Sequence, residues 1–155
     1  MRLNGFLSLL IVPALGFSAP AWACSCLPFG DDFFETVYLH NSKVKSGEWA
    51  ESSALTIVVA EVSEQLTPRQ GQQNFGSEFM RVNVIGSLQG NSAAKELTIK
   101  GGDGASCEMP VSSFIVGKKY VLALNQNEQA QYFMSLCGNY FKEMASGPVP
   151  SAQPQ

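Results

Sequence analysis

Four cysteines, at positions 24, 26, 107 and 137, constrain this chain more than any other feature. Two of them are separated by one residue, and the other two lie far along the chain. In an oxidising compartment such a set indicates a disulfide framework, whereas in the cytosol it indicates metal binding or catalysis. The compartment therefore decides what the cysteines do.

The first 23 residues have the features of a secretory signal peptide. Arg2 precedes an apolar run over residues 6–17, and Ala21-Trp22-Ala23 is a small-x-small cleavage site. The run is interrupted by Pro13 and is too short for a transmembrane helix. We therefore predict a secreted or periplasmic protein without a membrane span.

Cleavage after Ala23 makes Cys24 the first residue of the mature chain. A lipoprotein signal also ends before a cysteine, but it prefers Leu three residues earlier and small residues next. Ala21 and the bulky Trp22 occupy those positions, so we expect ordinary cleavage rather than acylation of Cys24. Cleavage after Ala21 is a further possibility.

Length and composition bound the mature protein. A chain of 155 residues with 45% hydrophobic and 15% charged residues is not a disordered polyelectrolyte. The formal net charge of −3, which becomes more negative without Arg2, disfavours nucleic acid as a partner. We expect one domain over residues 24–145 and an unfolded, Pro-rich tail over residues 146–155.

Val- and Ile-rich segments bounded by turn residues predict five strands, over residues 54–66, 75–88, 96–100, 119–125 and 132–136. In the first, Ile57 and Val59 share one parity; in the second, Met80, Val82 and Val84 share one. Short helical stretches are expected over residues 36–44, 47–53 and 139–145. This pattern is typical of an all-β sandwich or a small barrel.

The four cysteines allow three pairings. A Cys24–Cys26 bond conflicts with the usual Cα separation across a disulfide, and both other pairings attach the mature N-terminus to Cys107 and Cys137. Two anchors fix the direction of the terminus as well as its position, so the Cys24 amino group becomes a positioned chemical group. The alternative is that the bridges only prevent fraying. A zinc site of all four cysteines fits the spacing poorly.

Other candidate sites are weaker. His40, the single histidine, is expected to be packed or on the surface rather than to be a metal ligand. Two acidic pairs, Asp31 with Asp32 and Glu61 with Glu64, are expected to be solvated.

A catalytic function is not expected. One histidine and bridged cysteines provide no nucleophile with a base, so we predict neither an enzyme nor a cofactor. The glycine-rich residues 101–104 lack the Lys-Ser/Thr of a phosphate-binding loop and are interpreted as a turn.

The start Cys24-Ser25-Cys26-Leu27-Pro28, directly after a signal peptide, resembles the inhibitory domain of the tissue inhibitors of metalloproteinases. The segments TIVVAEVSE and VIGSLQG, the Ser106-Cys107 loop, residues 114–122 and Cys137-Gly138 follow in the family's order. The resemblance spans Cys24 to Ala145. It implies a netrin-like domain, a five-stranded OB-type barrel with short flanking helices, and we expect a bacterial single-domain member.

The resemblance also implies a function: inhibition of zinc metalloendopeptidases. The amine and carbonyl of Cys24 would chelate the zinc of the target enzyme, and the disulfides would be Cys24–Cys107 and Cys26–Cys137. The implied inhibitory ridge consists of Cys24, Ser25, Cys26, Leu27, Pro28, Ala105, Ser106 and Cys107. We expect a monomer whose partner is a zinc protease. The alternatives are a netrin-like binding module without inhibitory activity and a lipoprotein whose blocked amine cannot bind zinc.

Overall fold

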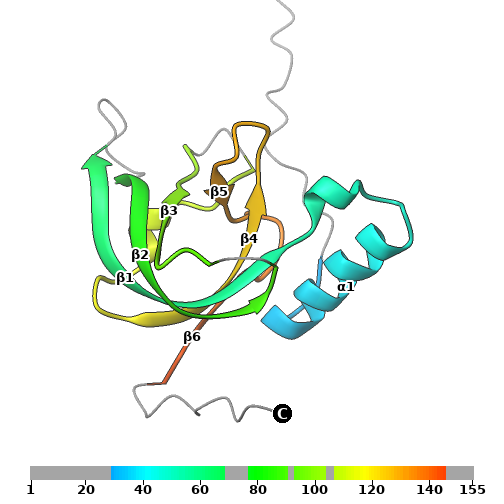
Figure 1. Ribbon diagram of the computed structural model, residues 1–155, viewed down its shortest axis with the longest axis horizontal. Coiled ribbons are helices and arrows are strands. Elements are labelled where there is room, and N and C mark those ends of the chain that lie inside the picture. Colours follow the sequence, from blue (N-terminus) through cyan, green and yellow to red (C-terminus); the bar gives the residue numbers. More distant parts are fainter. Residues whose placement is uncertain (1–28, 69–76, 91–92, 104–106, 146–155) are drawn as a thin grey trace, which may run out of the picture.

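The computed structural model describes residues 29–68, 77–90, 93–103 and 107–145 (Figure 1). Strands dominate this part of the chain, and its elements are, in order, α1 (Phe33–Lys45), the 3-10 helix η1 (Glu51–Ser53), β1 (Thr56–Pro68), β2 (Ser77–Gln89), β3 (Glu96–Lys100), the 3-10 helix η2 (Val111–Ser113), β4 (Lys119–Gln126), β5 (Tyr132–Phe133) and β6 (Phe141–Glu143).

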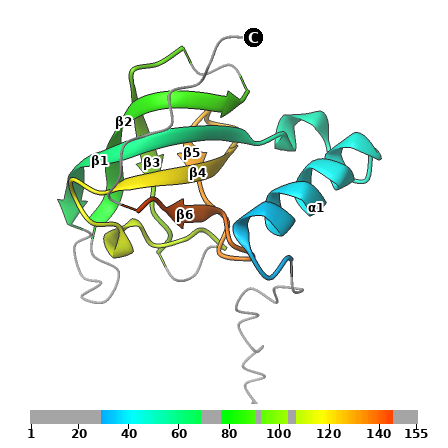
Figure 2. The same ribbon diagram turned by 90° about the horizontal axis from the view of Figure 1, so that it is seen from below.

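Five strands close into a barrel. The pairing order is β1-β2-β3-β5-β4, and β4 pairs back with β1. The pairs in the barrel are antiparallel except β3 with β5, which is parallel. Closure satisfies the strand edges that an open sheet would expose. The expectation of an all-β, five-stranded OB-type barrel with short flanking helices is therefore confirmed, and Figure 2 shows α1 packed beside the barrel.

Burial alternates along both of the first two strands. Met80 and Val82 of β2 are fully buried. In β1 the fully buried residues are Val58, Ala60 and Val62, while on the other parity Ile57 is buried and Val59 is half-buried. The pairing of β1 with β2 shifts register at several points, which mark β-bulges or other irregularities, and the buried residues keep their alternation across the shift between Val59 and Ala60.

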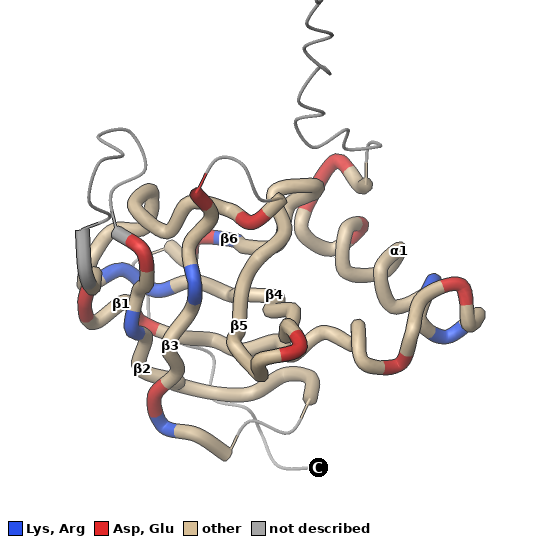
Figure 3. Tube along the Cα trace, turned by 90° about the horizontal axis from the view of Figure 1, so that it is seen from above, with Lys and Arg blue, Asp and Glu red and all other residues tan. Residues whose placement is uncertain are grey.

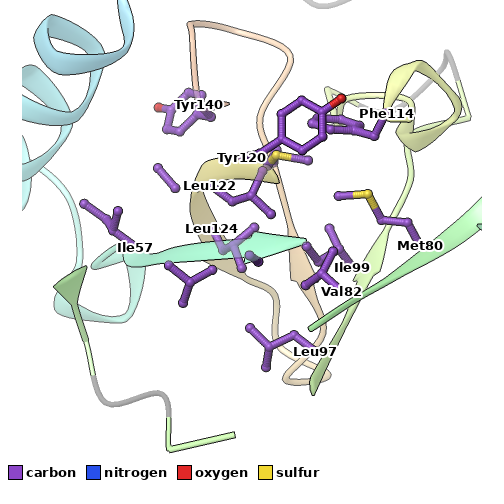
Figure 4. Close-up of a cluster of buried hydrophobic side chains, with 14 of the residues drawn as sticks. Ile57, Met80, Val82, Leu97, Ile99, Phe114, Tyr120, Leu122, Leu124 and Tyr140 are labelled. Atoms are coloured by element: carbon purple, nitrogen blue, oxygen red, sulfur yellow. The ribbon is translucent and has the colours of Figure 1, made fainter. Parts of the chain in front are cut away.

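The buried core of the barrel is almost entirely apolar. Figure 4 shows side chains from β1, β2, β3 and β4 pointing toward one another, with Leu122, Ile99 and Met80 among those fully buried. Aromatic rings close one side, where Phe114 lies 4.9 Å from Phe141 and 5.0 Å from Tyr120 between ring centroids. Burial of these apolar side chains is the main contribution to the stability of the barrel.

The prediction of a helix over residues 139–145 is wrong. Residues Phe141–Glu143 form β6, which pairs antiparallel with β4. The backbone of β4 pairs with this segment at Tyr120–Leu122, and the Phe141 ring packs against Phe114 on the barrel's aromatic side. Of the predicted strand over residues 132–136, only Tyr132–Phe133 forms β5, and Ser135 forms an isolated β-bridge with Glu108.

The helix expected over residues 36–44 is present and longer. It begins at Phe33, where the Asp32 carboxylate accepts a hydrogen bond of 2.9 Å from the Glu35 backbone N–H. This N-cap satisfies one of the backbone donors that a helix start leaves unpaired. Of the short helix expected over residues 47–53, only residues Glu51–Ser53 are helical, and they form the 3-10 helix η1.

Candidate functional site

Most of the implied inhibitory ridge lies outside the described residues, namely Cys24, Ser25, Cys26, Leu27, Pro28, Ala105 and Ser106. Cys107 is described and exposed, and Cys137 is half-buried. Both are disulfide-bonded. Their pairing with Cys24 and Cys26 stays a prediction.

The structure brings Cys107 and Cys137 to the same place. Residues 107–109 run antiparallel beside residues 134–136, with a β-bridge between Glu108 and Ser135. The Leu136 N–H donates to the Cys107 carbonyl oxygen at 2.8 Å, and the Met109 N–H donates to the Met134 carbonyl oxygen at 2.8 Å. Cys107 therefore lies beside the residue that precedes Cys137.

The base of the Cys107 loop is closely packed. The Gly102 N–H donates to the Met109 carbonyl oxygen at 2.9 Å, and a Cβ on Gly102 would lie 1.8 Å from the Glu108 carbonyl oxygen. Lys100 forms an ion pair of 3.0 Å with Glu108. Residues 101–103, which belong to the predicted turn over 101–104, have no regular secondary structure, and glycine is required at 102 by this backbone contact.

The first described residues reach the same region from the other end of the chain. The Thr36 hydroxyl donates to the Phe29 carbonyl oxygen at 2.8 Å, and the Asn139 side-chain amide donates to the Asp31 carbonyl oxygen at 2.9 Å. A Cβ on Gly138 would lie 3.1 Å from the Phe29 carbonyl oxygen. Figure 2 shows the start of α1 beside the orange segment between β5 and β6. Phe29, Cys107 and Cys137 therefore belong to segments that meet at one end of the barrel.

His40 is packed, which is one of the two environments, packed or surface, that the sequence predicted. It is 2% exposed, with Nδ1 2.9 Å from the Tyr140 hydroxyl oxygen and Nε2 2.7 Å from the Ser53 carbonyl oxygen. Burial lowers the pKa of His40, although the Ser53 hydrogen bond opposes this, and burial raises the pKa of Tyr140 to about 12. A neutral ring with Nε2–H donating to Ser53 and Nδ1 accepting from Tyr140 satisfies both contacts. Both nitrogens are thus used within the fold.

Aromatic rings surround His40. The Trp49 ring lies edge-on, 4.6 Å from the His40 ring between centroids, and the Phe29 ring stacks on Trp49 at 5.2 Å. Phe29, at the start of the described chain, is therefore fixed by ring stacking as well as by its carbonyl oxygen.

A shallow hollow of about 280 Å³ lies at the start of α1, lined by Asp31, Asp32, Phe33, Phe34, Asn139, Phe141 and Lys142. The Lys142 Nζ is 4.7 Å from the centroid of the exposed Phe34 ring. The Asp32 carboxylate already caps α1. The hollow borders the segment that follows Cys137.

The acidic pairs do not form a metal site. Asp31, Asp32 and Glu64 are exposed, as expected, and Glu61 is half-buried. Across the described ranges, no group of three or more His, Cys, Asp or Glu residues has the proximity to hold a metal ion. Figure 3 shows acidic and basic residues interspersed on the barrel and on α1. In the same part of the chain, no helix has the length and apolarity needed to cross a membrane.

Comparison with protein-family models, with curated proteins and with solved structures finds no match to this chain.

Thr36 and Asn139 are not among the site residues that were predicted from the sequence. The available signal was the spacing of Phe33, Thr36 and His40, which places them on one face of α1. Threonine and histidine are polar residue types, so the sequence alone did not indicate that Thr36 and His40 are buried on that face.

Proposed function

We propose that this protein is an exported inhibitor of zinc metalloendopeptidases, similar to the netrin-like inhibitory domain of the tissue inhibitors of metalloproteinases. The observation that carries the proposal is the meeting of three segments at one end of the barrel, at Phe29, Cys107 and Cys137. An N-terminus attached there would stand at a fixed place on a closed barrel.

The reach of the chain supports the implied disulfides. Cys26 lies three residues before Phe29 in the sequence, and an extended segment of that length spans at most about 11 Å. The Phe29 carbonyl oxygen lies close to Gly138, which follows Cys137. This reach allows Cys26 and Cys24 to bond to Cys137 and Cys107 in either of two pairings, and the resemblance implies Cys26–Cys137 with Cys24–Cys107.

Inhibition would follow from the chemistry of the terminus. A catalytic zinc keeps an exchangeable position for water, and the amine and carbonyl of one residue can occupy it as a five-membered chelate. The amine binds zinc only when unprotonated, and a free α-amino group has a pKa of about 7.7–8.0. Inhibition should therefore weaken as the pH falls below that range. Rigid presentation of the terminus lowers the ordering cost of binding.

The decisive experiment compares the mature protein beginning at Cys24 with a variant carrying one extra Ala before Cys24. Both are assayed on a panel of zinc endopeptidases that includes thermolysin and a metzincin, with peptide cleavage as the readout. We expect inhibition by the mature protein and its loss in the extended variant. Equal inhibition by both would exclude chelation through the terminus.

Two outcomes concern the alternatives. If the mature protein inhibits no enzyme of the panel, the proposed function is wrong and the binding module without inhibitory activity takes its place. Intact mass of the exported protein under non-reducing conditions identifies the cleavage site and the disulfides. A diacylglycerol-sized increment on Cys24 would support the lipoprotein instead.

A further inference from the structure

Thr36 is a buried polar residue in a helix face that otherwise packs on the barrel. Its exposed fraction is 0%, although α1 as a whole lies at the surface of the molecule. A buried hydroxyl is costly unless it is hydrogen-bonded. The position of Thr36 therefore requires partners, and the structure supplies two.

The two partners of Thr36 come from segments about a hundred residues apart. Its hydroxyl donates to the Phe29 carbonyl oxygen at 2.8 Å and accepts from the Asn139 backbone N–H at 3.1 Å. The side-chain amide of Asn139 donates to the Asp31 carbonyl oxygen at 2.9 Å and closes the arrangement. One hydroxyl thus joins the chain before α1 to the chain after Cys137.

Two glycines allow this close approach. A Cβ on Gly30, which has φ +85°, would lie 2.5 Å from the Thr36 backbone nitrogen. A Cβ on Gly138, which has φ +134°, would lie 2.9 Å from the Thr36 Cγ2 atom. Residues other than glycine rarely adopt these φ values. Glycine at positions 30 and 138 therefore allows both segments to approach Thr36 closely.

We propose that Thr36 is a positioning residue whose hydroxyl holds the chain at Phe29–Asp31 against residues 138–139 and thereby fixes where the mature N-terminus stands. The second half of this statement rests on the proposed function. The two hydrogen bonds of the Thr36 hydroxyl, to Phe29 and from Asn139, are called the clamp. The clamp is non-covalent and acts in addition to any disulfide at Cys137. Without the clamp, such a disulfide would attach the chain that leads to Cys24 but would not fix its direction relative to the barrel.

The test replaces the hydroxyl without changing the shape of the side chain. Thr36→Val keeps both branches but leaves the Phe29 carbonyl and the Asn139 N–H without their partner, whereas Thr36→Ser keeps the hydroxyl and loses a methyl group. We expect Thr36→Val to speed hydrogen exchange of the Asn139 amide by about tenfold and to weaken inhibition of the most sensitive panel enzyme by a similar factor. Thr36→Ser should restore both.

Val37→Ala is the matched control. Val37 is the next residue of α1 and packs against the core, so its truncation destabilises the same helix without touching the clamp. Exchange is compared after normalising each variant to its global stability. Val37→Ala should leave both the normalised exchange at Asn139 and the inhibition constant within about threefold of the wild type.

Each remaining outcome decides against part or all of the proposal. If Thr36→Val and Val37→Ala give the same normalised exchange at Asn139, the hydroxyl has no holding role. If Asn139 exchanges faster in Thr36→Val but inhibition is unchanged, the clamp does not position the terminus. If the wild-type protein inhibits nothing, the proposed function fails by itself, and the exchange measurements alone decide whether Thr36 holds the chain.

Discussion

The barrel interior and the junction between α1 and the barrel are stabilised by different forces. Inside the barrel, Leu122, Ile99 and Met80 are fully buried and apolar. Two of the three buried residues of α1 are polar, Thr36 and His40, and both form hydrogen bonds with residues about a hundred positions away, Asn139 and Tyr140. The barrel interior is stabilised mainly by non-directional burial, whereas α1 combines the burial of Phe33 with hydrogen bonds that need particular atoms.

This difference determines which substitutions each region tolerates. An apolar core accepts another side chain of similar volume, because its stability depends mainly on area and packing. A buried hydrogen-bonded junction does not accept an isostere that lacks the polar atom, because the partner is left unpaired. The region that the proposed function depends on is therefore the one with the stricter chemical requirements.

Truncation of the barrel core should have the largest effect. Leu122→Ala removes a fully buried side chain from β4, and we expect it to lower the free energy of unfolding by about 2–5 kcal/mol. Leu122→Met keeps the volume and should cost less than about 1.5 kcal/mol. Urea unfolding measures both, and a similar cost for the two would mean that shape rather than volume governs the core.

Removal of one hydroxyl at the junction should come next. Tyr140→Phe keeps the ring but leaves His40 Nδ1 without its partner, at an expected cost of about 1–3 kcal/mol in the free energy of unfolding. Tyr38→Phe on the exposed face of α1 is the control, with an expected change within about 0.5 kcal/mol. Equal effects would remove the distinction between the junction and the surface.

Acid should weaken the junction through His40. Burial lowers its pKa below the ordinary value of 6.5, so the unfolded chain binds the proton more readily. The stability that neutral His40 contributes is present above pH 6.5 and is lost as the pH falls through the lowered pKa. Urea midpoints between pH 7 and pH 5 should fall in the wild type. The decline should be shallower in His40→Gln, and an identical slope would show that His40 does not titrate differently in the two states.

A surface ion pair should have the smallest effect. Arg81 and Glu64 lie 2.8 Å apart between strands β2 and β1, but both side chains are more than a third exposed. Solvent screens such a pair, so Glu64→Gln should change the free energy of unfolding by at most about 1 kcal/mol. A larger loss in urea unfolding would place this pair among the structural contacts of the barrel.

Local patterns were sufficient for much of the barrel. The predicted strand over residues 96–100 has the same bounds as β3, and Met80 and Val82 face the core as their alternation indicates. Prediction failed where a distant partner decides the conformation. Residues 141–143 form a strand because the edge of β4 pairs with them, and no pattern within the segment contains that information.

The sequence by itself determined the approximate positions of the five barrel strands. Strand periodicity is local, so it can be read without knowing what lies opposite. Only the tertiary structure decided that β4 closes on β1, that Cys107 lies beside the residue before Cys137, and that Thr36 joins Phe29 to Asn139. These contacts join residues far apart in the chain, and their geometry follows from closing the barrel and packing α1 against it.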